Sequence, residues 1–153
     1  MELAGRVALI TGGKRIGAVV AAELASRGVD VALSYNRSQA EAEKTAASIR
    51  GLGRRALVKQ ANLANAADCE ALVSAAADEL GRLDILINMA SMYIRKPLEN
   101  LTVEDWDANL AVDLRSAFLC SRAAAPHMRR VGGGRIINFS DWLSRSGRPV
   151  RAR

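Results

Sequence analysis

The clearest chemical signal in this sequence is a glycine-rich stretch near the N-terminus. It follows four apolar residues, 7–10, that predict a buried strand, and it leads into a helical pattern that begins at Ile16. Glycine lets a backbone turn sharply and approach a ligand closely. Because the free amides of such a turn and the positive end of a helix dipole face the same point, the stretch predicts a cradle for a phosphate or pyrophosphate group. Its residues are Thr11, Gly12, Gly13, Lys14, Arg15, Ile16 and Gly17.

A second polar stretch, Asn36-Arg37-Ser38, follows the next predicted strand. It lies roughly 20 residues beyond the glycine turn, where an NAD site would place an acidic residue against the ribose hydroxyls. This stretch contains no carboxylate, so Arg37, the Ser38 hydroxyl and Lys14 or Arg15 can meet a 2′-phosphate instead. NADP is therefore favoured over NAD. The alternative is that Arg37 and Lys14 are solvated surface charges.

Alternating strands and helices would bring these stretches together. Apolar runs predict five strands, at 7–10, 29–35, 56–60, 83–88 and 135–140. Helical patterns lie between them, including one from Ser38, which is expected to cap it, and a long one that begins at a capping box, Thr102 to Asp105. Pro126 is expected to kink or end that long helix. The pattern predicts an α/β protein with a parallel sheet covered on both faces, whose ligands lie beyond the carboxyl ends of the strands.

Length and composition set the outer bounds. The 153 residues, half of them hydrophobic and 25% charged, predict one soluble globular domain, 1–153. No apolar run is long enough to cross a bilayer and no leader pattern is recognised, so no membrane partner and a cytoplasmic location are expected. Cys69 and Cys120 lack the spacing of a zinc or redox motif and are expected to be reduced and partly buried. His127 is the only histidine, so no metal site is expected.

The net charge of +6 is uneven, because arginines crowd the last quarter of the chain. These residues lack interleaved aromatic side chains and a helix that could read bases, so a solvated basic segment is favoured over a nucleic-acid surface. They are Arg129, Arg130, Arg135, Arg145, Arg148, Arg151 and Arg153.

In these blocks and their order, the sequence resembles the N-terminal portion of the short-chain dehydrogenases/reductases. The family's T-G-x-x-x-G-x-G turn corresponds to residues 11–17, which are one residue shorter and lack a middle glycine. Its N-N-A-G block corresponds to 88–91, and its fifth strand to 134–141. The segments 14–17 and 36–38, with Asp141, are similar to the NADP-dependent pteridine reductase-like branch. The resemblance implies a Rossmann-type doubly wound sheet with strand order 3-2-1-4-5, truncated relative to the family.

The family transfers hydride between a nicotinamide and a carbonyl, alcohol or C=N substrate. The resemblance places Asp141 on the position of a serine that orients the substrate. Asp113 falls on an asparagine that supports a proton relay, although an ionised aspartate can accept a hydrogen bond but cannot donate one. Asn109, one turn earlier, is expected to be a helix-surface residue. Further cofactor contacts are implied for Asn62, Leu63, Asn88, Ala90 and Ser91.

The family's proton donor and its lysine, Tyr-x-x-x-Lys, do not occur in these residues. Tyr35 and Tyr93 are the only tyrosines, and Gln39 and Pro97 stand four positions later. The chain is therefore expected to supply the cofactor-binding half of an NADP-dependent oxidoreductase, with weak or no turnover by itself. It can be a fragment, a degenerate paralogue or one of two pairing chains. The alternative function is a non-catalytic nucleotide-binding or regulatory module.

The expected partners are a small-molecule substrate and a second copy of the chain, which would associate through the long helix. Without the family's covering helix, apolar surface of the fifth strand and the long helix is expected to be exposed.

Overall fold

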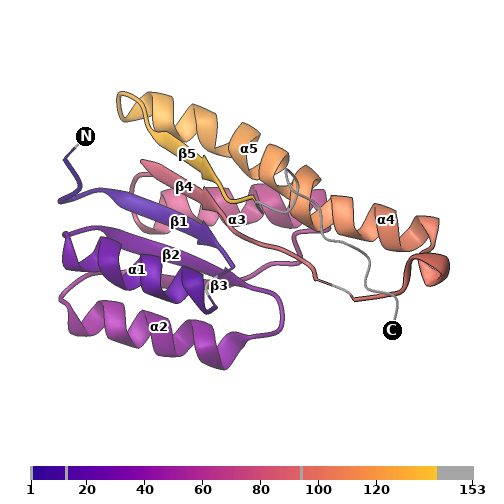
Figure 1. The fold of residues 1–153 in the computed structure, drawn as a ribbon. Helices are drawn as coiled ribbons and strands as arrows, with labels where there is room; N and C mark the ends of the chain where they lie inside the picture. The colour runs from indigo at the N-terminus through magenta and orange to yellow at the C-terminus, as the bar shows by residue number, and fades with distance from the viewer. Residues whose placement is uncertain (1, 13, 94, 141–153) are drawn as a thin grey trace.

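Five parallel strands form the centre of the molecule, in a computed structural model that describes residues 2–12, 14–93 and 95–140. Their order across the sheet is β3-β2-β1-β4-β5, which confirms the predicted order (Figure 1). The strands are β1 (Val7–Thr11), β2 (Asp30–Tyr35), β3 (Ala56–Gln60), β4 (Ile85–Asn88) and β5 (Arg135–Asn138). All pairings are parallel, so the carboxyl ends of the strands meet along one edge of the sheet.

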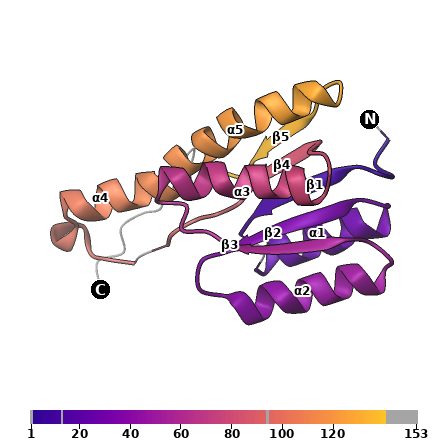
Figure 2. The same ribbon diagram turned by 180° about the vertical axis from the view of Figure 1, so that it is seen from behind.

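Helices cover both faces of this sheet. Helices α1 (Ile16–Ser26) and α2 (Gln39–Gly51) lie on one face, and α3 (Ala66–Glu79) and α5 (Ser116–Arg130) lie on the other (Figures 1 and 2). The strands divide their side chains accordingly, because successive residues of a strand point to opposite faces. Ala8 and Ile10 of β1 join the cluster with α1, whereas Val7 and Leu9 join the cluster with α3 and α5. The continuous apolar runs therefore read as strands buried on both sides.

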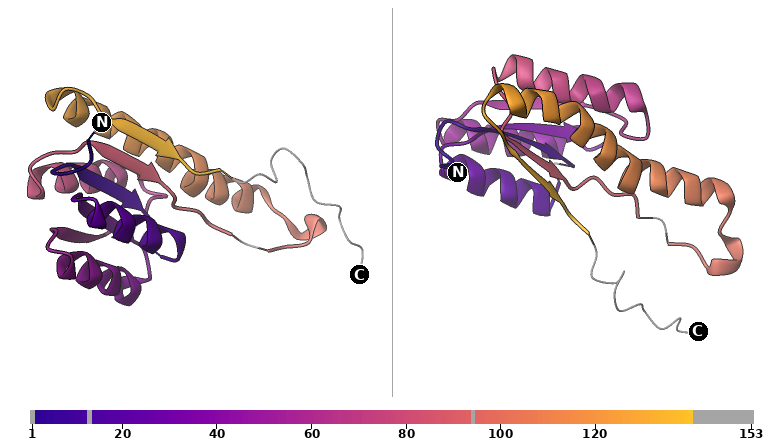
Figure 3. Two further views of the ribbon diagram at one scale, coloured as in Figure 1. Left: turned by 60° about the vertical axis from the view of Figure 1, so that its left-hand side comes forward. Right: turned by 90° about the horizontal axis from the view of Figure 1, so that it is seen from above.

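Three helical segments follow one another after β4. They are a short 3-10 turn, η1 (Leu98–Asn100), then α4 (Val103–Leu110) and a π-helical segment, η2 (Ala111–Arg115), which runs into α5. The predicted capping box is present, since Thr102 Oγ1 accepts from the Asp105 N–H at 3.2 Å and Asp105 Oδ2 accepts from the Thr102 N–H at 3.1 Å. Helix α4 extends past the carboxyl ends of the strands (Figure 3).

Of the two outcomes predicted for Pro126, a kink or an end of the long helix, the end is wrong. Helix α5 continues through Pro126 to Arg130, although proline supplies no N–H to the preceding turn. Ala124 and Met128, on either side of it, are buried in the core cluster shared with α3, and this packing holds the helix together. Cys69 and Cys120 are free thiols, as predicted, but they are fully buried in the same cluster. Burial raises the pKa of Cys120 to about 12.

Apolar surface is exposed on the long helix and on β5, as expected from the sequence. Leu114 and Phe118 are 64% and 60% exposed, and Ile136 and Ile137 of the edge strand are 40% and 43% exposed. Among the described residues, no helix combines the length and the apolarity needed to cross a bilayer.

A buried carboxylate joins the amino ends of β1 and β4. Asp84 is fully buried and accepts hydrogen bonds from the Val7 N–H at 3.0 Å, from Arg6 at 3.0 Å and from two nitrogens of Arg82 at 2.8 Å. Burial alone would raise the pKa of Asp84. The hydrogen bonds from Arg82, Val7 and Arg6 outweigh burial, so its pKa lies below the ordinary value of 3.8.

Replacing Asp84 by asparagine is expected to lower the free energy of unfolding at pH 7 by about 2–3 kcal/mol, because two guanidinium groups lose their buried counter-charge. Since the folded pKa lies below the unfolded one, the carboxylate stabilises the fold above pH 3.8, and this stabilisation is lost as the pH falls through the folded value. Urea unfolding at several pH values checks this. The difference in the free energy of unfolding between the wild type and Asp84→Asn should narrow below pH 3.8. The exposed Asp78→Asn control should have nearly the same free energy of unfolding as the wild type. A gap that stays constant at acid pH would contradict this role.

Candidate functional site

The last residue of β1 connects the glycine turn to the segment after β4. Thr11 is buried, and its Oγ1 accepts hydrogen bonds from the Met89 N–H at 3.0 Å and from the Ala90 N–H at 3.2 Å. Thr11 also lies opposite Asn88 in the register of the two strands. Two of the predicted cofactor-binding segments, 11–17 and 88–91, are therefore brought together at the carboxyl edge of the sheet.

The glycine turn folds tightly against the start of α1. Gly12 has a φ of +84°, and a Cβ at this position would stand 3.3 Å from the backbone of Ala90. Gly17 is buried in the first turn of α1, and a Cβ there would overlap the carbonyl oxygen of Gly12. Only glycine fits at position 17 without movement of the backbone. Gly13 lies outside the described residues.

Arg15 occupies the position at which the sequence lacks a middle glycine. Its φ of 54° and ψ of −110° make it the only non-glycine residue with a positive φ among the described residues. This conformation is costly for a residue with a Cβ. Both Lys14 and Arg15 are exposed at the amino end of α1, where the helix dipole favours an anion. The shortened turn therefore places a strained non-glycine residue, Arg15, directly before α1.

The second polar stretch lies between β2 and α2. Asn36 and Arg37 are exposed, and the Asn36 carbonyl accepts from Gln60 Nε2 at 3.1 Å. Ser38 stands at the N-cap position of α2, as predicted, but its side chain makes no capping hydrogen bond. Lys14 reaches across from the glycine turn to this region.

The partner of Lys14 is a residue that the sequence analysis missed. Lys14 Nζ lies 2.9 Å from Glu41 Oε1, in the first turn of α2. The hydrogen bond from Lys14 lowers the pKa of the Glu41 carboxyl below its ordinary value of 4.5. Glu41 is three residues after Ser38, and this spacing places both on one side of a helix start. An acidic residue therefore stands beside the basic residues assigned to the 2′-phosphate.

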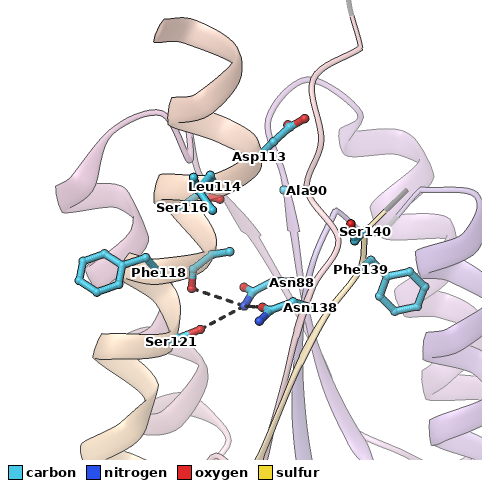
Figure 4. A pocket seen from close by; sticks show the side chains of 11 residues that line it. Asn88, Ala90, Asp113, Leu114, Ser116, Phe118, Ser121, Asn138, Phe139 and Ser140 are labelled. Atoms are coloured by element: carbon cyan, nitrogen blue, oxygen red, sulfur yellow. Dashed lines mark hydrogen bonds between the residues drawn. The ribbon is translucent and has the colours of Figure 1, made fainter. Parts of the chain in front are cut away.

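A small cavity of about 320 Å³ lies between the ends of β4 and β5 and the long helix (Figure 4). Asn88 lines it and is 6% exposed; its Nδ2 donates to Asn138 Oδ1 at 2.8 Å and to Ser121 Oγ at 3.2 Å. These bonds join β4 to β5 and to α5. Asn88 Oδ1 has no hydrogen-bond partner among the described residues. Asp113 and Ser140 also line this cavity.

Two side chains of the long helix hold the segment after β4 by its backbone. Asp113 Oδ1 accepts from the Met92 N–H at 2.7 Å, and Asp113 Oδ2 accepts from Ser91 Oγ at 3.2 Å. Asn109 Nδ2 donates to the Met92 carbonyl at 2.8 Å. The prediction that Asn109 is a helix-surface residue is therefore wrong, since it is partly buried and bonded. We call Asn109 and Asp113 the Met92 clamp.

The remaining predicted residues are less well connected to this site. The exposed Asn62 follows β3; its N–H donates to Asp68, and its Oδ1 accepts from the Ala64 N–H at 3.3 Å. Leu63 is buried in the core cluster with α3. Asp141, predicted to orient the substrate, lies outside the described residues. Within the part of the chain that the structure describes, no three potential ligands come together to hold a metal ion.

Comparisons with known proteins agree with this geometry. The family model for short chain dehydrogenase matches residues 6–152. A hydroxynaphthalene reductase of Aspergillus fumigatus is 37% identical over 153 residues, covering 99% of this chain and 55% of the relative. A 3-oxoacyl-(acyl-carrier-protein) reductase of Synechocystis is 35% identical over 151 residues, covering 98% of this chain and 61% of the relative. The chain thus spans little more than half the length of these curated relatives.

Solved structures give the same result. A short chain dehydrogenase from Burkholderia cenocepacia, solved in complex with NADP, superposes with a TM-score of 0.90 at 38% identity, covering 97% of this chain and 60% of that one. A blue fluorescent protein from a metagenomic library, solved with NADPH, superposes with a TM-score of 0.86 at 33% identity, covering 97% and 61%. With a family match over nearly the whole chain and the strand order and glycine turn described above, this protein belongs to the short-chain dehydrogenase/reductase family.

Proposed function

We propose that this protein binds NADP(H) at the carboxyl edge of its sheet. It would thereby form the cofactor-binding half of an oxidoreductase that acts on a carbonyl, alcohol or C=N substrate. The observation that carries the proposal is the glycine turn, joined by Thr11 to the segment after β4 and flanked by basic residues beside the end of β2. Relatives solved with NADP and NADPH support the choice of cofactor.

Each segment of the edge has a proposed role toward the cofactor. The amides of residues 12–17 and the amino end of α1 bind the pyrophosphate. Arg37, Ser38 and Lys14 bind the 2′-phosphate. Segments 62–63 and 88–91 flank the adenine and nicotinamide portions, as the family resemblance implies. When bound, the cofactor supplies the hydride that the reaction transfers.

Asp113 is proposed as a positioning residue. Its two carboxylate oxygens are occupied by Met92 and Ser91, and an ionised carboxylate cannot donate a proton along a relay. Together with Asn109 it fixes the backbone that follows the cofactor segment 88–91. Asp141 stays the proposed substrate-orienting residue.

Two functions share this binding site and differ in turnover. The 153 residues contain no Tyr-x-x-x-Lys pair. For this reason we predict weak or no turnover by this chain. A non-catalytic nucleotide-binding module would bind the same cofactor and turn over nothing. Oxidation of NADPH with a panel of carbonyl and pterin substrates distinguishes the two functions.

We further propose a homo-oligomer, formed through the long helix. Trp106, Leu114 and Phe118 expose between 60% and 66% of their surface along α4, η2 and α5, and burial of such apolar surface favours association. The single domain 1–153 and the cytoplasmic location stay predictions.

The proposed cofactor choice is tested by titrating the protein with NADPH and NADH and following nicotinamide fluorescence. NADPH is expected to bind more tightly. Arg37→Ala and Lys14→Ala should each weaken NADPH by about 10-fold, since each removes a charge-assisted hydrogen bond, and should leave NADH within about twofold. If NADH binds more tightly than NADPH, the roles given to Arg37 and Lys14 are wrong. If neither nucleotide binds, the proposed function fails.

Gly17→Ala is expected to weaken both nucleotides by about 10-fold, because a Cβ at this position pushes against the Gly12 carbonyl and opens the turn. Gly51→Ala is the matched control, since a Cβ at position 51 meets nothing within 4 Å. Calorimetric titration of both variants makes the comparison. Unchanged binding by Gly17→Ala would show that the tight turn does not hold the cofactor.

The role of Asp113 in the Met92 clamp is tested by amide hydrogen exchange. Asp113→Ala should speed exchange of the Met92 amide by about 10-fold or more, because its acceptor is lost, and should weaken NADPH binding. Asp113→Asn keeps an acceptor oxygen and should restore slow exchange and binding. If Asp113→Asn behaves like Asp113→Ala, the charge of Asp113 matters and its role is more than positioning.

A further inference from the structure

The ion pair between Lys14 and Glu41 involves one of the residues proposed above to bind the 2′-phosphate, the group that distinguishes NADP from NAD. It joins the glycine turn to the first turn of α2, and the two side chains are 55% and 48% exposed. Residues 36–38 immediately precede that turn, and the Ser38 hydroxyl makes no capping bond. In the free protein, one of the cations proposed for the 2′-phosphate is therefore already paired with a carboxylate.

A phosphate that arrives at this place meets two effects of Glu41. The carboxylate occupies a hydrogen bond of Lys14 that the phosphate needs. Its negative charge also lies within one helical turn of Ser38, where it repels a second anion. Neither effect acts on NADH, which carries a hydroxyl at the ribose 2′ position. Glu41 therefore lowers the affinity for NADPH and leaves the affinity for NADH unchanged.

We propose that Glu41 is a specificity-determining residue that competes with the 2′-phosphate for Lys14 and so lowers the preference for NADPH over NADH. This inference rests on the proposed function. Because both partners are half exposed, the ion pair is weak and easily opened, so Glu41 reduces NADPH affinity without preventing binding.

The chain offers a matched control on the same helix. Glu43 is also in α2, is 49% exposed and pairs with Arg50 at 3.7 Å, away from the glycine turn. Glu41→Gln and Glu43→Gln make the same change in net charge at nearly equal exposure. A general effect of charge would therefore appear in both variants, whereas the proposed competition appears only in the first.

The experiment measures Kd for NADPH and NADH in the wild type and both variants, at low and at physiological salt. Glu41→Gln is expected to tighten NADPH by about 3- to 10-fold and to leave NADH within about twofold, with a smaller gain at higher salt. Glu43→Gln should change neither. Binding of 2′,5′-ADP and 5′-AMP, which differ only in the 2′-phosphate, should show the same contrast. If Glu41→Gln binds NADH as the wild type does, its glycine turn is intact.

A double-mutant cycle with Lys14→Gln tests whether Glu41 acts through Lys14. The gain from Glu41→Gln should be smaller when Lys14 is absent. An equal gain in both backgrounds would overturn the competition. It would also be overturned if Glu41→Gln left the ratio of the Kd for NADH to the Kd for NADPH within twofold of the wild-type value, or lowered that ratio. These failures differ from failure of the proposed function, in which the wild type binds neither nucleotide.

Discussion

The Thr11 hydroxyl makes the contact on which the proposed site depends. It accepts two backbone amides from the segment after β4, at 3.0 and 3.2 Å, in a buried position. This hydroxyl satisfies both amides at the last residue of β1, immediately before the chain turns at Gly12. Because buried amides without partners are costly, this contact fixes both the exit of the glycine turn and the path of residues 88–91. The remaining parts of the edge are built around these two fixed segments.

The parallel sheet was predictable because its causes are local in the sequence. Runs such as residues 7–10 and 85–87 are apolar at successive positions, which indicates strands buried on both faces, and helical patterns alternate with them. The capping box of Thr102 and Asp105 was predictable for the same reason, since its partners lie three residues apart. Once the glycine turn and the block at 88–91 suggested a family, the strand order followed from the resemblance.

The features that were not predictable depend on contacts between distant segments. Nothing local to Asn109 indicates that its amide reaches Met92, 17 residues earlier. Glu41 reads as an ordinary residue in the first turn of a helix until Lys14 is seen beside it. Pro126 reads as a helix end, but packing of its neighbours in the core outweighs the lost hydrogen bond. In each case a tertiary contact determines a feature that the local sequence pattern does not encode.

The central claim is that the cofactor lies on the glycine turn and on the segment joined to it by Thr11. The most direct measurement is a set of amide spectra of 15N-labelled protein during titration with NADP⁺. The account predicts that the largest shifts fall on Gly12, on residues 14–17 and on Ala90, while Val7 and Arg82, at the opposite edge of the sheet, do not move. Shifts confined to other segments, or no shifts at saturating NADP⁺, would contradict it.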